Sequence, residues 1–172
     1  MRSTILQFLL VLCVVFSVST TAYSQNGTDT AKDQEAIKSM LAKYKSYIEK
    51  GDAENLLKII TSESKKKLEK ELEKVKEFVK DIPRDKQDEE ISAFGKTPRE
   101  ITAMDVTSFL KWALSRLGKF DIQDMKETVL TEIKFSNDGK KATLSWKGEN
   151  TVEAPKTVVK EDGSWKIELT LS

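Results

Sequence analysis

The sequence predicts an α+β fold in which helices come first and an antiparallel β-meander follows. Between residues 36 and 117, apolar residues recur at intervals of three and four, as they do along the buried face of a helix. From Glu127 onward this spacing changes to two, which is typical of strands with one buried face. Short turn sequences, at 136–139 and 161–163, separate the strand segments. They favour antiparallel neighbours whose apolar face the helices cover.

Composition limits the classes of function. The 172 residues include 29 basic and 28 acidic side chains, one cysteine and no histidine. This length suits a single domain with its own core. Because the net charge is near zero, there is no long-range field to attract nucleic acid, and no nucleic-acid partner is expected. The missing histidine excludes a Ser-His-Asp triad, a Cys-His dyad and histidine-ligated zinc. No cofactor and no metal are expected.

The first segment has the pattern of a secretory signal peptide. Arg2 precedes an apolar run over residues 5–18, and the small residues of Ala22-Tyr23-Ser24 follow. About 14 apolar residues would span roughly 21 Å as a helix, less than the roughly 30 Å of a bilayer core. The sequence therefore predicts a cleaved signal peptide over residues 1–24 and a periplasmic or secreted protein without a stable membrane span. Retention of the segment as an anchor is left open.

Cleavage after Ser24 removes the single cysteine, Cys13, which lies inside the apolar run. The exported chain then has no disulfide, thiol nucleophile or thiolate metal site. A short tail at 25–29 and one domain at 30–172 are expected to remain.

Three helices are predicted in the first part of this domain. Thr30 with Asp33 resembles a capping box that opens the first helix. Gly51 suits the position just after that helix, and Asp52 suits the N-cap of a short second one. The buried side of the first helix is expected to carry Ala36, Ile37, Met40, Leu41, Tyr44, Tyr47 and Ile48.

The third helix is expected to begin near Thr61 or Ser62 and to run to Ile82, where Pro83 ends it. Its other faces alternate Lys and Glu at helical spacing, which favours a solvated surface with weak ion pairs. A coiled-coil adaptor built on this helix is a further alternative. Its apolar positions are Leu68, Leu72, Val75, Val79 and Ile82.

A loop is expected over residues 84–96, because this stretch is polar with little periodicity. The sequence Thr97-Pro98-Arg99-Glu100 then has an N-cap, a proline at N1 and an acid at N3. Asp105 is expected to cap a further helix that runs through Leu117 and ends at Gly118.

Four strands complete the prediction. In the first, alternation places Val129, Thr131, Ile133 and Phe135 on one face. The third, at 151–160, contains Pro155, which suits an edge strand or a bulge. The second strand is expected to have one apolar face made of Ala142, Leu144 and Trp146. The last strand is expected to have one made of Trp165, Ile167, Leu169 and Leu171.

Two segments carry a resemblance to a known family. They are the helix end Tyr47-Ile48-Glu49-Lys50-Gly51-Asp52-Ala53-Glu54-Asn55-Leu56 and the closing hairpin Val158-Val159-Lys160-Glu161-Asp162-Gly163-Ser164-Trp165-Lys166-Ile167. With helices between them, residues 30–171 resemble the NTF2-like (SnoaL-like) superfamily, in particular its small exported members with domains of unknown function. Both segments are structural motifs, not catalytic ones.

The resemblance implies a cone in which a curved sheet and the first helices enclose a pocket. Members of the family use this pocket as isomerases, dehydratases or cyclases, or as binding and assembly modules that are often dimeric. Their enzymes generally place an Asp-His pair, or an Asp with Tyr hydroxyls, inside the cone. Histidine is absent here, and no residue matches a catalytic motif of the family.

Candidate pocket residues are aromatic or acidic. Tyr44 and Tyr47 are candidate hydroxyl donors, with core packing as the alternative. Asp105 is a candidate general base, with helix capping as the alternative. Candidates to wall an apolar ligand site are Trp112, Trp146 and Trp165, for which packing between sheet and helices is again the alternative.

Two functions from different classes follow. The first is a non-enzymatic exported module that binds a small apolar ligand or a protein partner, with homodimerisation through the sheet left open. The alternative is a cofactor-free lyase or isomerase that uses a carboxylate and a tyrosine, with Asp105 and Tyr44 as weak catalytic candidates. Such an enzyme needs an inward carboxylate whose pKa is raised, close to a phenol.

Overall fold

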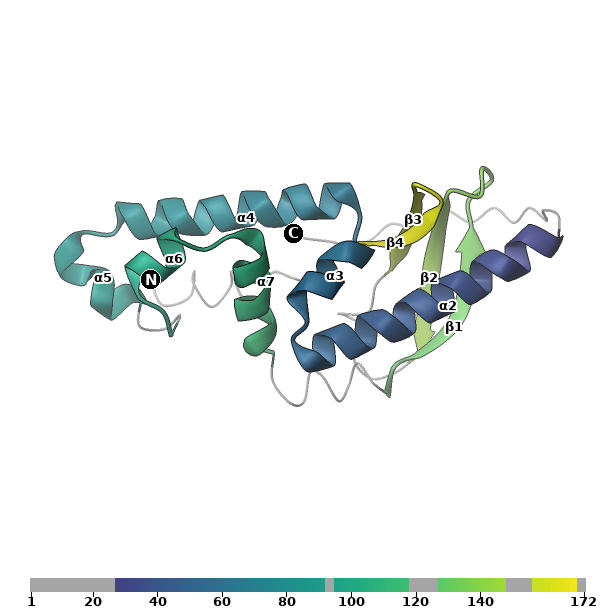
Figure 1. Ribbon diagram of the computed structural model, residues 1–172, viewed down its shortest axis with the longest axis horizontal. Coiled ribbons are helices and arrows are strands. Elements are labelled where there is room, and N and C mark those ends of the chain that lie inside the picture. Colours follow the sequence, from purple (N-terminus) through teal and green to yellow (C-terminus); the bar gives the residue numbers. More distant parts are fainter. Residues whose placement is uncertain (1–26, 92–94, 118–126, 148–155, 170–172) are drawn as a thin grey trace.

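Helices fill the first part of the chain and strands the second, which confirms the predicted α+β class (Figure 1). The computed structural model describes residues 27–91, 95–117, 127–147 and 156–169. The helices described are α2 (Gly27–Lys50), α3 (Ala53–Ile59), α4 (Ser62–Asp81), α5 (Arg84–Ile91), α6 (Pro98–Thr102) and α7 (Val106–Ser115). The strands are β1 (Val129–Phe135), β2 (Lys141–Lys147), β3 (Thr157–Glu161) and β4 (Ser164–Glu168), and they form one antiparallel sheet in the order β1-β2-β3-β4.

Several predictions fall outside the described residues. These are the signal peptide at 1–24, the tail before Gly27, Gly118 as a helix end, Pro155 in the third strand and Leu171 in the last. Within the described part of the chain, no helix has the length and apolar content needed to cross a membrane.

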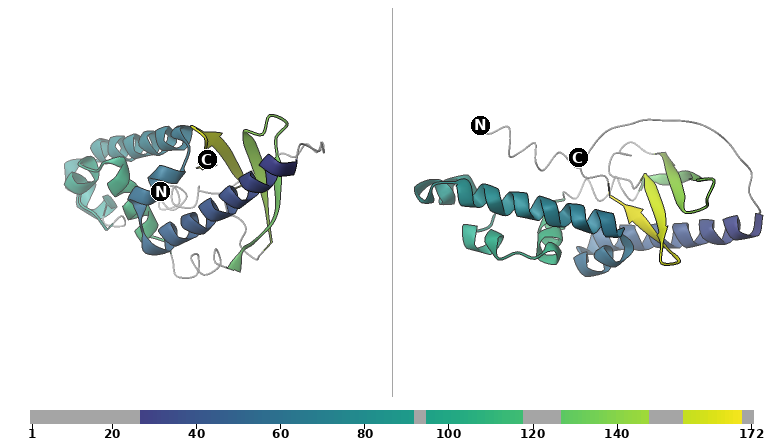
Figure 2. Two further views of the ribbon diagram at one scale, coloured as in Figure 1. Left: turned by 45° about the vertical axis from the view of Figure 1, so that its right-hand side comes forward. Right: turned by 90° about the horizontal axis from the view of Figure 1, so that it is seen from above.

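The main core lies between α2 and one face of the sheet. Figures 1 and 2 show α2 running across the sheet, with α3 beside it. The face of α2 that is buried matches the predicted one, except that Ala36 is exposed and Tyr47 half-buried. Buried residues of this core include Ile37, Leu41 and Tyr44 from α2, Leu56 from α3, and Ala142, Leu144, Val158, Trp165 and Ile167 from the sheet.

A second core lies at the other end of the molecule, where α5 and α6 pack on the far half of α4 (Figure 1). Helix α4 joins the two cores, because Leu68 belongs to the first and Leu72 to the second. The expectation that the helices cover the sheet therefore holds for α2 and α3 and is wrong for α5 and α6. The buried members of the second core are Leu72, Val79, Ile82, Ile91, Ile101 and Met104.

Helix α5 corrects the prediction of a loop at 84–96. It contributes a single apolar residue, Ile91, which is fully buried in the second core. The Gln87 side-chain amide donates to the carbonyls of Val79 and Ile82 and so caps the end of α4. A single apolar residue cannot recur at intervals of three and four, so the sequence does not indicate this helix.

The remaining helix ends follow local signals. Gly51 has φ +64° after α2, and the Asp52 side chain accepts from the Asn55 amide. Thr97 and Glu100 form the predicted capping box. Thr30 is the exception: α2 begins at Gly27, so Thr30 lies inside the helix and is not its cap.

A β-bulge in β1 changes which residues face the core. The pairing of β1 with β2 shifts between Leu130 and Glu132, so Thr131 has no partner in the register. Leu130 consequently packs on the core with Ile133, whereas Val129 is 61% exposed. The prediction that Val129 and Thr131 share a face with Ile133 is therefore wrong, since one extra residue reverses the alternation.

The start of α4 is joined to the end of β4 by Ser64, which is fully buried. Its Oγ accepts from the Leu169 amide at 2.8 Å and lies 2.7 Å from Thr61 Oγ1. We expect Ser64→Ala to lower the free energy of unfolding by about 1–3 kcal/mol, because the Leu169 amide loses its acceptor. Urea unfolding measures this effect. Ser39→Ala, at an exposed position of α2, is the control; an equal change in both variants would contradict the assignment.

Candidate functional site

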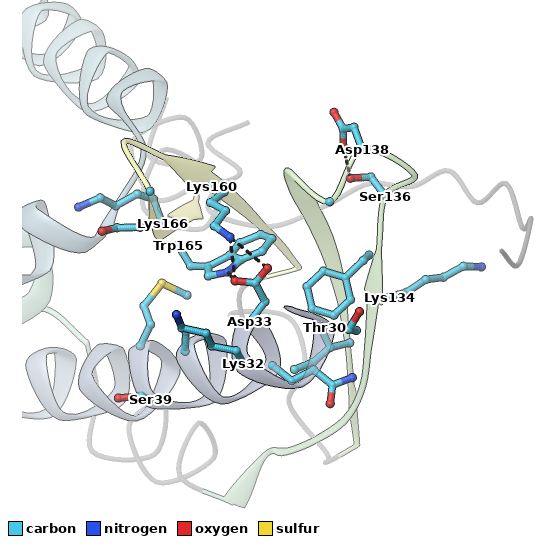
Figure 3. Close-up of a pocket in the computed structure, with 18 of the residues that line it drawn as sticks. Thr30, Lys32, Asp33, Ser39, Lys134, Ser136, Asp138, Lys160, Trp165 and Lys166 are labelled. Carbon is cyan, nitrogen blue, oxygen red and sulfur yellow. Dashed lines mark hydrogen bonds and ion pairs between the residues drawn. The ribbon is translucent and has the colours of Figure 1, made fainter. Parts of the chain in front are cut away.

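A cleft of about 1490 Å³ lies between the N-terminal half of α2 and the sheet (Figure 3). Its lining comes from four places: α2 between Thr30 and Lys43, Ile59 at the end of α3, β1 with the turn after it, and the β3–β4 hairpin. The α2 side and the sheet side are far apart in the sequence, so the cleft exists only in the folded chain.

One wall of the cleft is aromatic. The rings of Phe135 and Trp165 meet edge to face, with centroids 5.7 Å apart and an interplanar angle of 63°. Trp165 is 6% exposed and belongs to the main core, while Phe135 packs against it. Met40 and Ile133 also line the cleft. This wall therefore offers an apolar surface that the core holds in place.

The β3–β4 turn sets the second feature of the cleft. Asp162 has φ 51° and Gly163 has φ 75°, as both central residues of a two-residue type I′ hairpin require. The turn places Lys160 directly opposite Trp165 in the register, and both point toward α2.

The Asp33 carboxylate joins these two residues to α2. Its Oδ1 accepts from Lys160 Nζ at 2.9 Å and from Trp165 Nε1 at 2.9 Å, and its Oδ2 lies 3.1 Å from the same amine. The amine is also 5.7 Å from the centroid of the Trp165 ring. Figure 3 shows all three side chains meeting in the cleft. We call Asp33, Lys160 and Trp165 the Asp33 cluster.

The electrostatics of this cluster keep Asp33 ionised. Burial raises the pKa of the Asp33 carboxyl, but the hydrogen bonds from Lys160 and Trp165 outweigh burial, and the charges of Lys160 and Lys32 add to them. The net result is a pKa below the ordinary value. A carboxylate held in this way fixes the cleft wall and is poorly suited to take up a proton near neutral pH.

The predicted pocket residues are divided between cleft and core. Trp165 lines the cleft. Tyr44 is buried in the main core, and Tyr47 and Trp146 pack against that core without lining the cleft. The Lys45 amine lies 5.6 Å from the centroid of the Trp146 ring and donates to the carbonyl of Thr128. For these three aromatic residues the structure agrees with the alternative of core packing.

Trp112 lies elsewhere, in the helical end of the molecule. It is half-buried, its ring centroid is 5.9 Å from that of Phe109, and it lines a smaller groove of about 540 Å³ with Met104. The three predicted tryptophans therefore do not wall a common pocket.

Asp105 is the N-cap of α7 and is exposed. Its Oδ1 accepts from the Ser108 amide at 2.7 Å, and this hydrogen bond lowers the pKa of the carboxyl. Neither Asp105 nor Tyr44 lines the cleft, so the structure does not bring these two catalytic candidates together there.

The sequence did not indicate that Asp33, Lys160 and Phe135 line the cleft. Asp33 is separated from its two partners by 127 and 132 positions, and no local signal indicates such contacts. Among the residues that the structure describes, no group of three or more His, Cys, Asp or Glu side chains is placed to hold a metal ion.

Comparisons with models of protein families, with curated proteins and with solved structures gave no match. The resemblance to the NTF2-like superfamily accordingly stays a prediction from the sequence.

Proposed function

We propose that this chain is an exported, periplasmic or secreted NTF2-like module that binds a small ligand with an apolar body in its cleft and does not transform it. The observation that carries the proposal is the cleft itself, with Phe135 and Trp165 as its aromatic wall. Binding sites for small molecules are typically concave and largely preformed, with apolar and aromatic side chains in their walls. In this cleft the apolar wall lies among polar and charged residues that outnumber it.

Two further points support the proposal. The core holds the aromatic wall in place, so a ligand would not have to order it on binding. The cleft also lies between the first described helix and the sheet, where the family resemblance implies a pocket.

The lyase or isomerase alternative is less well supported. It needs an inward carboxylate with a raised pKa next to a phenol, whereas hydrogen bonds lower the pKa of both Asp33 and Asp138 in the cleft. The tyrosines among the described residues, Tyr44 and Tyr47, do not line it. The arrangement therefore favours binding over acid-base catalysis.

The proposal is tested with a neutral fluorescent probe, N-phenyl-1-naphthylamine, titrated into the purified protein. We expect saturable binding at one site. Ala36 and Ala42 are both exposed on α2, but only Ala36 lines the cleft. Ala36→Phe should therefore weaken binding by at least about tenfold, a loss of about 1.4 kcal/mol, and Ala42→Phe should leave it unchanged.

These alanine variants form a matched pair, because each adds the same ring to the same helix. Wild type and variants also share residues 1–26, so any binding of the probe to that segment cancels in the comparison. Binding that does not saturate, or equal affinity in both variants, would refute the proposal.

A further inference from the structure

We infer that the ligand of the cleft is an amphiphile with an anionic headgroup. This inference rests on the proposed function and adds the charge of the ligand to it. It comes from the balance of charged groups around the cleft.

Lysines outnumber carboxylates in the cleft lining, although the two are almost equal in the whole chain. The chain has 29 basic and 28 acidic residues. The cleft is lined by five lysines and three carboxylates, although the Lys134 and Lys166 side chains extend away from it (Figure 3). The lysines are Lys32, Lys43, Lys134, Lys160 and Lys166, and the carboxylates are Asp33, Glu132 and Asp138.

The three carboxylates already have hydrogen-bond donors within the chain. Asp33 accepts from Lys160 and Trp165, as described above. Glu132 Oε2 accepts from Ser145 Oγ at 3.3 Å. Asp138 Oδ1 accepts from Ser136 Oγ at 2.6 Å and from the Lys140 amide at 3.0 Å. Each carboxylate that lines the cleft thus already accepts a hydrogen bond from another residue of the chain.

Two of the lysines, by contrast, have no such partner. Lys160 is bound by Asp33, and the Lys166 amine donates to the carbonyl of Lys58. The Lys134 side chain extends away from the cleft (Figure 3). Among the contacts of the described residues, Lys32 and Lys43 make no hydrogen bond and no ion pair. Their ammonium groups are available to an anion that enters the cleft.

The positions of these lysines suit an elongated amphiphile. Lys32 and Lys43 lie on α2 about 16 Å apart along the helix axis, and the apolar Met40 lines the cleft between them. An apolar chain can therefore rest on the aromatic wall while its headgroup meets an ammonium at the margin, without burial of an unpaired charge.

The test compares three molecules that share one chain and differ in headgroup. Dodecanoate and dodecyltrimethylammonium below their micellar concentrations, and dodecanol below its solubility limit, compete with the neutral probe for the full-length protein. We expect dodecanoate to displace the probe at an about five- to tenfold lower concentration than dodecanol, and the cation to be the weakest competitor. Because the lysines lie near solvent, this preference should shrink at high salt.

A matched pair of double variants of α2 assigns the preference to the lysines. Lys32→Gln/Lys43→Gln should abolish the preference for dodecanoate over dodecanol, with each competitor measured against the variant's own affinity for the neutral probe. The control, Lys38→Gln/Lys50→Gln, removes the same charge from exposed residues of the same helix outside the cleft. It should keep the preference of the wild type.

The outcomes separate the two proposals. Equal displacement by dodecanoate and dodecanol would overturn the inference about charge and leave the proposed function standing. Absence of saturable probe binding would overturn both. Sedimentation with phosphatidylglycerol vesicles that is lost in the cleft double variant, without displacement by dodecanoate, would also overturn the inference. The two lysines would then bind a membrane surface and not a soluble amphiphile.

Discussion

Replacement of Ile167 by alanine is expected to lower the free energy of unfolding by about 3–5 kcal/mol. Ile167 is fully buried in the main core, lies opposite Val158 in the β3–β4 register and forms a parallel bridge with Ile60 just before α4. Its side chain therefore packs where the sheet meets the helices. Removal of three carbons there leaves a cavity that secondary structure on both sides prevents from closing.

The measurement is equilibrium unfolding in urea. Val129→Ala is the control, because Val129 belongs to the same sheet but is 61% exposed, so its loss should stay within about 0.5 kcal/mol. Comparable losses in the two variants would mean that the core does not lie on the face of the sheet described above.

The second large effect is expected from Asp33→Ala, a loss of about 2–4 kcal/mol near neutral pH. The change leaves the Lys160 amine and the Trp165 indole N–H without their common acceptor in a partly buried place. Asp33→Asn should lose less, because the amide oxygen still accepts from Trp165 but carries no charge. Glu35→Gln, on the exposed side of α2, should change stability by less than about 0.5 kcal/mol.

Stability measured against pH tests the charge of Asp33 directly. Its pKa in the folded protein lies below the ordinary value of about 3.9, so the unfolded chain binds the proton more tightly. The stabilisation is therefore fully present above the ordinary pKa and is lost as the pH falls through the folded value. The difference between wild type and Asp33→Asn should be constant above about pH 5 and shrink below about pH 4. A difference that does not depend on pH would exclude the ionised cluster.

Local signals in the sequence predicted most element boundaries. Asp52, Thr97 and Asp105 cap the helices that they were expected to cap, since each cap depends on an amide only three residues away. Thr61 caps α4, which was expected to begin near Thr61 or Ser62. The Asp162–Gly163 turn follows from the positive φ that this hairpin type requires. The order of helices and strands follows from the change of apolar period.

Predictions failed where residues distant in the sequence decide the structure. Helix α5 is held by one buried residue, Ile91, and by the hydrogen bond from its Gln87 side chain to the end of α4. Its sequence therefore has no periodic pattern of apolar residues. The bulge at Thr131 is visible only in the pairing with β2. Asp33, expected in a local capping box, binds residues of the β3–β4 hairpin instead.

The sequence by itself thus determined the fold class, the caps and the turns, because each depends on the spacing of neighbouring residues. Only the tertiary structure decided which aromatic side chains pack in the core, which one lines the cleft, and which lysines there lack a partner among the described residues. The physical reason is that the amphipathic pattern shows which face of an element is buried but not which other element covers it. The contacts of Asp33 with Lys160 and Trp165 arise only when α2 packs across the sheet.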